Sequence, residues 1–276
     1  MIERAARWVS QVAVVSVSQV AVAGCLAVGC GAIPKTPPAS RVIFAISTAQ
    51  REVIELDRSD CTQPADSRWE WQLVDNAGRA TAAAPMTSTV VATNAADATG
   101  ATNTGNVTGA TLSARDIGGD TEYLSLTPSG LVALFAVDSP SDRVRTFFTP
   151  PLTLDVPRTP TPVVTTSSSA MRVEWIDGRG ERDSGRGERS VRATEVASIM
   201  TSQGSFETLV IESEFQAFLR FAKVRRTMTT WIAPRIGCIA QRWDERVIVL
   251  GIEISRDCGT AVRVSPFHVH GAPLVP

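Results

Sequence analysis

The segment Phe206-Glu207-Thr208-Leu209-Val210-Ile211-Glu212 carries the β-strand signal that decides the fold. It follows the turn residues Gln203-Gly204-Ser205 and is rich in aromatic and β-branched side chains. Similar segments follow at short spacing, with Asp244-Glu245 read as a turn: Val224–Trp231, Ile239–Trp243, Val247–Ile254 and Ala261–Val264. Many short strands with little helical periodicity predict an antiparallel sheet, a sandwich or a barrel.

The same pattern extends toward the N-terminus. Strands are expected within Arg41–Leu56 and at Trp69–Leu73, Glu122–Leu126, Leu131–Val137, Arg143–Phe148, Met171–Ile176 and Arg189–Ala197. Phe215–Phe221 fits a helical face or a strand, and the strand is favoured because strands flank it. Prolines predict a break at Thr149-Pro150-Pro151 and irregular chain over Pro157–Ser169. Residues 41–265 are therefore predicted to form one mainly β domain, an antiparallel curled sheet or incomplete barrel.

Residues 81–114 differ sharply from the rest of this domain. They consist mostly of Ala, Thr, Asn, Gly and Val, and Asp97 is their only charged residue. A stretch without aromatic residues buries too little apolar surface to offset the entropy of ordering it. The sequence therefore predicts a disordered insertion or a long mobile loop here.

The N-terminus has the layout of a secretory signal. Arg4 and Arg7 precede an apolar run, Val9 to Gly24, which ends in small residues before Cys25. Val22-Ala23-Gly24-Cys25 resembles the lipobox of bacterial lipoproteins, in which the signal is removed and the new N-terminal cysteine is acylated. Cys30 in Ala27-Val28-Gly29-Cys30 is the alternative lipidation site. A transmembrane anchor and a cleaved signal without lipidation stay open as alternatives.

These features divide the chain into segments. Residues 1–24 are a lipoprotein signal peptide, and residues 25–40 form a proline-rich tether that contains Pro34, Pro37 and Pro38. The β domain at 41–265 and a C-terminal tail at 266–276 follow. Since neither Leu26 nor Gly31 is the aspartate that commonly retains lipoproteins at the inner membrane, an outer-membrane location is favoured in a cell with two membranes.

Charge and cysteine content narrow the partners. The net charge of −1 provides no broad electrostatic attraction for nucleic acid or for anionic lipid surfaces. Export would permit disulfides, and Cys61, Cys238 and Cys258 are the candidate partners. A bridge from Cys258 to either of the other two is one reading, and three thiols are the alternative, because sequence does not assign connectivity.

Catalytic and metal-binding patterns are weak in this chain. Its two histidines, His268 and His270, have no carboxylate or cysteine at matching spacing, so no metal site is predicted. The repeat at Gly178–Arg182 and Gly185–Arg189 combines Gly, Arg and Glu, which favours a solvated hairpin loop over a phosphate loop. We expect neither an enzyme nor a cofactor.

Three motifs between Gly130 and Arg256 resemble an uncharacterised family of bacterial envelope proteins. They are Phe147-Phe148-Thr149-Pro150-Pro151-Leu152, Gly204-Ser205-Phe206-Glu207-Thr208 and Trp231-Ile232-Ala233-Pro234-Arg235-Ile236-Gly237. The chain departs from that family at Trp175, which lacks the usual preceding Gly. Members resemble the lipoprotein-localisation factors, whose antiparallel sheet curls into an incomplete barrel around an apolar cavity.

Two functions follow from this resemblance and from the leader. In the first, the half-barrel binds an apolar ligand or lipid, lined by Phe206, Leu209, Ile211 and Trp231. In the second, the domain is a structural or protein-interaction module of the cell envelope without a ligand. In both, acyl chains at the N-terminus attach the protein to a lipid bilayer. No protein partner can be named from the sequence.

Overall fold

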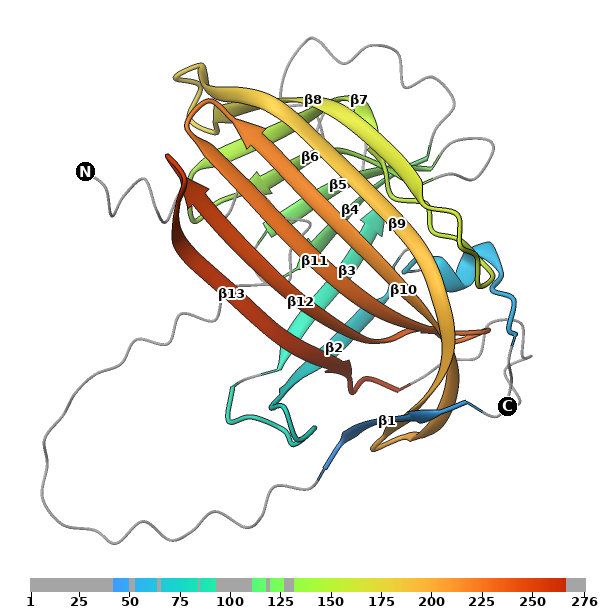
Figure 1. Ribbon diagram of the computed structural model, residues 1–276. Helices are drawn as coiled ribbons and strands as arrows, with labels where there is room; N and C mark the ends of the chain where they lie inside the picture. The colour runs from blue at the N-terminus through green and yellow to red at the C-terminus, as the bar shows by residue number, and fades with distance from the viewer. Residues whose placement is uncertain are drawn as a thin grey trace, which may run out of the picture.

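Thirteen β-strands and one short 3₁₀ turn make up the part of the chain described by the computed structural model (Figure 1). That part comprises residues 42–49, 53–63, 66–83, 85–92, 111–117, 120–126 and 132–266. The elements are β1 (Phe44–Thr48), η1 (Arg58–Cys61), β2 (Arg68–Val74), β3 (Met86–Ala92), β4 (Thr111–Ile117), β5 (Asp120–Leu126), β6 (Val132–Ser139), β7 (Val144–Thr153), β8 (Thr165–Trp175), β9 (Glu181–Thr201), β10 (Gly204–Leu219), β11 (Ala222–Ala233), β12 (Gly237–Val249) and β13 (Ile252–Arg263).

All thirteen strands belong to one antiparallel sheet. Its order is β1-β9-β10-β11-β12-β13-β2-β3-β4-β5-β6-β7-β8. The long strand β9 pairs with β10 on one side, and on the other with β8 and, near its C-terminal end, with β1. These pairings bring the last strand of the order back beside β9, so the sheet curls on itself. The prediction of a mainly β, antiparallel curled sheet is confirmed.

Several predicted breaks lie within strands. Asp244 and Glu245, predicted as a turn, lie inside β12. Their side chains point to opposite faces of the sheet, where Asp244 pairs with Arg256 of β13 and Glu245 with Arg226 of β11. Pro150 and Pro151 lie within β7, where the register with β6 shifts between Leu134 and Ala136. Such an irregularity accommodates prolines, which lack the amide N–H needed for regular pairing.

Two further segments are more regular than predicted. Strand β8 begins at Thr165, inside the stretch expected to be irregular. Strand β3, Met86–Ala92, lies inside the predicted insertion at 81–114, and β4 starts there as well. The β-branched residues of β3 pair with β2 and β4, and these neighbouring strands supply the partners that an isolated segment lacks. Residues 93–110 of the insertion lie outside the described residues.

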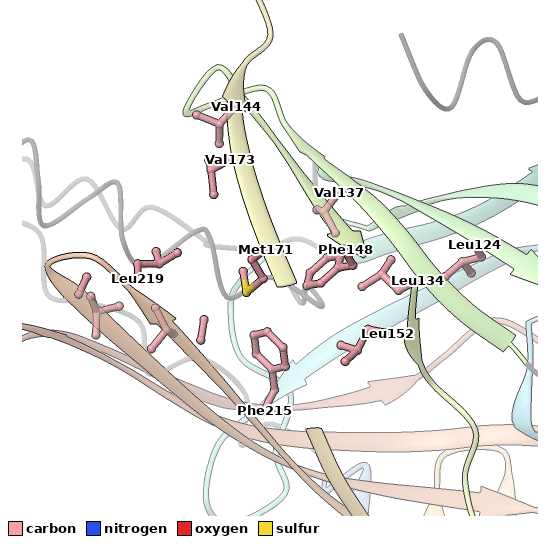
Figure 2. Packing of buried hydrophobic residues seen from close by; sticks show 14 residues of the cluster. Leu124, Leu134, Val137, Val144, Phe148, Leu152, Met171, Val173, Phe215 and Leu219 are labelled. Carbon is pink, nitrogen blue, oxygen red and sulfur yellow. The ribbon is translucent and has the colours of Figure 1, made fainter. Parts of the chain in front are cut away.

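An apolar inner core joins two walls of the curled sheet (Figure 2). Phe215 of β10 packs against Phe148 of β7 with ring centroids 6.5 Å apart, and Met171 of β8 lies beside them. The fully buried members of the inner core also come from both walls: Leu134, Val144, Leu152, Val173, Ala217, Val224 and Val247. Their exposure is 0–1 %, so they contact other protein atoms on all sides.

A second core lies on the opposite face of the same strands, near the end where β9 turns into β10. Successive side chains of a strand point to opposite faces. Ile211 and Phe215 of β10 therefore face inward, whereas Val210 and Phe206 face the other way. This outer core is covered by β1, whose Phe44 packs edge-on against Trp231 at 5.6 Å. We call this end of the sheet the base end.

Residues 53–61, which we call the strap, close the inner face near the base end. Ile54 and Leu56 pack on Leu209 and Ile211, and the amide of Leu56 donates to the carbonyl of Arg158. The strap then enters η1, where the buried Asp60 carboxylate accepts hydrogen bonds from the Asp57 amide at 2.8 Å and the Arg235 amide at 2.6 Å. Because Arg235 lies in the turn between β11 and β12, Asp60 joins the strap to that turn.

Candidate functional site

The four residues predicted to line an apolar cavity divide between two faces of the sheet. Leu209 and Ile211 belong to the cluster under the strap, and Phe206 and Trp231 belong to the outer core. Leu209, Ile211 and Trp231 are 0 %, 2 % and 3 % exposed. Side chains without accessible surface line no open volume. Their role in ligand binding stays a prediction, and it would require the strap or β1 to move away.

The cysteines are spread over three regions. Cys25 and Cys30 lie outside the described residues, and Cys61, Cys238 and Cys258 are present as thiols. Cys258 is exposed in the middle of β13 opposite Asp244, which is six residues along β12 from Cys238. At ~3.4 Å per residue, that separation is about 20 Å, whereas a disulfide needs Cα atoms within ~7 Å. The structure therefore does not bring Cys258 to Cys238.

The two Gly-Arg-Gly-Glu-Arg repeats have different structures. The first begins in the β8–β9 turn, as predicted, but its Glu181 and Arg182 already belong to β9. The guanidinium groups of Arg179 and Arg182 lie 4.0 and 4.1 Å from the ring centroid of Trp175. The second is inside β9, which corrects the prediction of a loop. Gly185 is needed there, because an added Cβ would lie 1.9 Å from the backbone oxygen of Phe218; at Gly187 an added Cβ would meet only side chains, Met171 Sδ at 3.0 Å and the Phe215 ring at 3.1 Å.

Ionisable groups lie on the inner face beside the inner core. Arg226 and Glu245 are buried, with Arg226 Nη1 3.8 Å from Glu245 Oε2. Burial raises the pKa of the Glu245 carboxyl to about 7; Arg226 opposes the rise, and Asp257 adds to it. Asp257 in turn accepts a hydrogen bond from the Trp243 indole at 3.0 Å. A carboxyl that titrates near neutral pH makes the stability of the protein sensitive to pH.

A polar groove of about 500 Å³ lies over the outer face of β8, β9 and β10. It is lined by Thr166, Ser167, Ser168, Glu188, Arg189, Ser190, Glu214 and Gln216. Glu188 pairs with Arg186 at 2.9 Å, and Glu214 pairs with Arg225 at 2.7 Å. Both carboxylates have cationic partners, and Arg189 donates to the backbone carbonyls of Thr153 and Asp155, so the groove leaves mainly hydroxyl groups for a ligand.

Large apolar side chains are exposed at the opposite end of the sheet from the base end. Three hairpin turns, β8–β9, β10–β11 and β12–β13, lie next to one another there (Figure 1). They expose Ile176, Phe221, Leu250 and Ile252, which are 47 %, 64 %, 79 % and 68 % accessible. We call these four residues the tip surface. The Leu250 amide donates to the Phe221 carbonyl at 3.3 Å, so the second and third turns are in contact.

Leu250 is unfavourable for folding in two ways, its backbone conformation and its exposure. It has a positive φ of 51° and precedes Gly251, whose φ is 83°, in the two-residue turn between β12 and β13. Such a turn favours Asn-Gly or Asp-Gly, since a left-handed conformation costs an ordinary residue about 1 kcal/mol. A leucine that is both strained and exposed contributes little to folding, which points to a role outside the fold.

Cationic side chains flank the tip surface. Arg220 and Lys223 lie on either side of Phe221, and Arg179 lies in the neighbouring turn. Asp177 is occupied by Arg143 at 3.1 Å and Arg179 at 2.9 Å. This surface was not predicted from the sequence, although a signal was present: an apolar residue occupies each of the three turns, where polar residues are usual.

Comparisons with protein-family models, with curated proteins and with solved structures find no match. Within the described ranges, no helix is long and apolar enough to cross a membrane. Among those same residues, no three His, Cys, Asp or Glu side chains lie together as a metal site would require. His268 and His270 lie outside them.

Proposed function

We propose that this protein is an exported lipoprotein, acylated at Cys25, whose β domain docks on a lipid bilayer through the tip surface. Residues 25–40 serve as the tether, and the outer membrane is the favoured location in a cell with two membranes. The domain then acts as an interaction module of the envelope rather than as an enzyme. The observation that supports this proposal most directly is the exposure of Phe221, Leu250 and Ile252 on adjacent hairpin turns.

The arrangement of these side chains suits a lipid interface. Neighbouring strands lie ~4.8 Å apart, so successive hairpin turns lie about 10 Å apart along the sheet end. Apolar groups at that spacing can enter the boundary between headgroups and acyl chains separately. Arg220 and Lys223 beside Phe221 can keep their charged ends at headgroup level while their stems follow the apolar surface.

The free energy expected from burying the tip surface in a bilayer is modest. Burying a large apolar side chain contributes about 1.5–3 kcal/mol, and Phe221, Leu250 and Ile252 are each about two-thirds exposed or more. Together they contribute roughly 5 kcal/mol, comparable to the ~5 kcal/mol with which a single myristoyl chain binds a membrane. This is weak alone. It becomes effective when an acylated N-terminus already holds the domain near a bilayer, because the second contact is then intramolecular.

The tether can bring the tip surface to the bilayer that holds the anchor. It leads to β1 at the base end, whereas the tip surface lies at the other end of β10. The sixteen residues of β10 have a contour of about 50 Å. The predicted tether at 25–40 can span at most about 55 Å. Docking on the anchoring membrane is therefore within reach of a fully extended tether.

Vesicle binding tests this function. The predicted mature chain, residues 25–276, carries Cys25→Ser and Cys30→Ser so that both the leader and acylation are excluded, and it is sedimented with vesicles of phosphatidylethanolamine and phosphatidylglycerol. We expect Phe221→Ser combined with Leu250→Asn to reduce the bound fraction at least tenfold. The matched control combines Val163→Ser and Met200→Ser, which remove exposed apolar side chains of 64 % and 51 % accessibility away from the tip surface. The control should bind within twofold of the parent.

A second readout locates the contact with lipid. Phe221→Trp should add to the quenching that brominated lipid causes among the parent's own tryptophans, and Val163→Trp should not. Equal loss of binding in the tip and control variants, or no quenching at position 221, contradicts lipid docking. Retention of a protein partner by the tip surface, without vesicle binding, would instead support an envelope interaction module of another kind.

A further inference from the structure

The strap and the β11–β12 turn bring two cysteines of distant sequence position together. Cys61 ends η1, and Cys238 is the second residue of β12. Their preceding residues are in contact, since an added Cβ on Gly237 would lie 3.4 Å from the carbonyl oxygen of Asp60. Asp60 also accepts the Arg235 amide at 2.6 Å, which fixes the strap against this turn.

Both cysteine side chains lie on the same side of the sheet. Cys238 is the cross-strand partner of Ile232 in β11, and directly paired residues share a face. Cys61 packs against the cluster that contains Ile232. Cys238 thus lies beside one member of the cluster against which Cys61 packs. The Cys238 group also raises the pKa of the Cys61 thiol, after burial and two aspartates, which places the two sulfurs within electrostatic range.

We propose that Cys61 and Cys238 form a disulfide that clamps the strap to β12. The two thiols each lose a proton and an electron, and the new S–S bond joins the two sulfurs. A small-molecule disulfide such as oxidised glutathione takes up the two electrons and two protons, and its own S–S bond is broken to give two thiols. The first exchange forms a mixed disulfide, and the second protein thiol then displaces glutathione.

The burial of Cys61 predicts when the disulfide forms. Burial raises the pKa of the Cys61 thiol to about 12, so the thiolate, which is the reactive species, is scarce at neutral pH in the folded chain. The bond therefore forms readily while the chain folds and only slowly once the strap is in place. Cys258, which is exposed on β13, has no cysteine opposite it in the sheet register and stays a thiol.

Thiol trapping after refolding tests the clamp. The full chain with Cys25→Ser and Cys30→Ser is refolded in a mixture of reduced and oxidised glutathione, alkylated, and digested without reduction. We expect mass spectrometry to find a peptide that links Cys61 to Cys238, with Cys258 alkylated or glutathionylated. Cys258→Ser is the matched control and should leave the link intact, whereas Cys61→Ser should leave Cys238 unlinked.

A stability measurement separates the clamp from an incidental link. A Cys61–Cys238 disulfide closes the long loop that runs from η1 to β12. It should raise the melting temperature by about 10 °C, and reductant should remove this increase. Reductant should not change the melting temperature of the Cys61→Ser variant. Alkylation of both Cys61 and Cys238 in the refolded chain, or a link from either one to Cys258, overturns the proposal.

Discussion

The indole of Trp243 lies directly over Gly259 of the neighbouring strand. An added Cβ on Gly259 would lie 2.5 Å from Cζ2 and 2.7 Å from Cη2 of that ring. The two residues are direct partners in the β12–β13 register. The indole cannot move away easily, because its N–H donates to Asp257 at 3.0 Å and the ring packs with Trp71 and Met86. Glycine at 259 is thus a packing requirement of this core.

Gly259→Ala should therefore lower the free energy of unfolding by about 3 kcal/mol, the upper end of the range for overpacking. Gly187→Ala is the comparison, because its added Cβ meets the flexible end of Met171 at 3.0 Å and should cost about 1 kcal/mol. Urea unfolding measures both. In a Trp243→Leu background the cost of Gly259→Ala should nearly vanish, and an unchanged cost there would show that the indole is not the cause.

Leu250→Asn should stabilise the protein although it removes a large apolar side chain. Asn tolerates the positive φ of 51° better than Leu does, and the position is 79 % exposed, so little packing is lost. We expect a gain of about 1 kcal/mol, or a rise in melting temperature of about 2–4 °C. The same substitution should weaken vesicle binding. Lower stability would mean that Leu250 packs in the fold.

Stability should fall as the pH rises from about 5 to above 7. The Glu245 carboxyl has a pKa of about 7 in the folded protein against an ordinary value of 4.5, so the folded state holds a proton that the unfolded state has lost in this interval. Deprotonation then favours unfolding, by at most about 3 kcal/mol above pH 7. Chemical unfolding across this pH range measures the slope.

Glu245→Gln should flatten most of that slope, since glutamine stays neutral and can still face Arg226. A residual slope should persist, because burial also raises the pKa of Asp142 to about 7. Asp142 is partly exposed, so solvent screening reduces its share. An unchanged slope in Glu245→Gln would assign the pH dependence to other groups.

Cys25→Ser should abolish acylation of the mature chain. Mass spectrometry of the purified parent should find an N-terminal peptide that starts at a modified Cys25 and lacks residues 1–24. The serine variant should accumulate as an unacylated precursor, whereas Cys30→Ser should be processed like the parent. A modified N-terminus at Cys30 would move the lipidation site, and an unmodified N-terminus beyond Cys30 would contradict both sites.

Local sequence was a reliable guide where one strand face is buried and one is exposed. Trp69–Leu73, where apolar and polar residues alternate, lies within β2 as predicted, and Val224–Trp231 lies within β11. Local sequence failed at Asp244 and Glu245, because the pattern of a single segment does not reveal that arginines on adjacent strands neutralise both carboxylates. Cys258, which falls between the predicted segments Val247–Ile254 and Ala261–Val264, lies in the middle of β13, because pairing with β12 continues through it.

The sequence by itself determined the class of fold, since side-chain alternation and turn chemistry are local properties that thirteen antiparallel strands largely preserve. It also supplied the signal and lipidation hypothesis, which rests on residues 1–30 alone. Only the tertiary structure decided which apolar residues are core and which are exposed. Leu209 and Leu250 are chemically identical, yet one is fully buried under the strap and the other lies on a turn. Burial depends on which segments fold over a residue, and strand pairing across more than a hundred residues sets that arrangement.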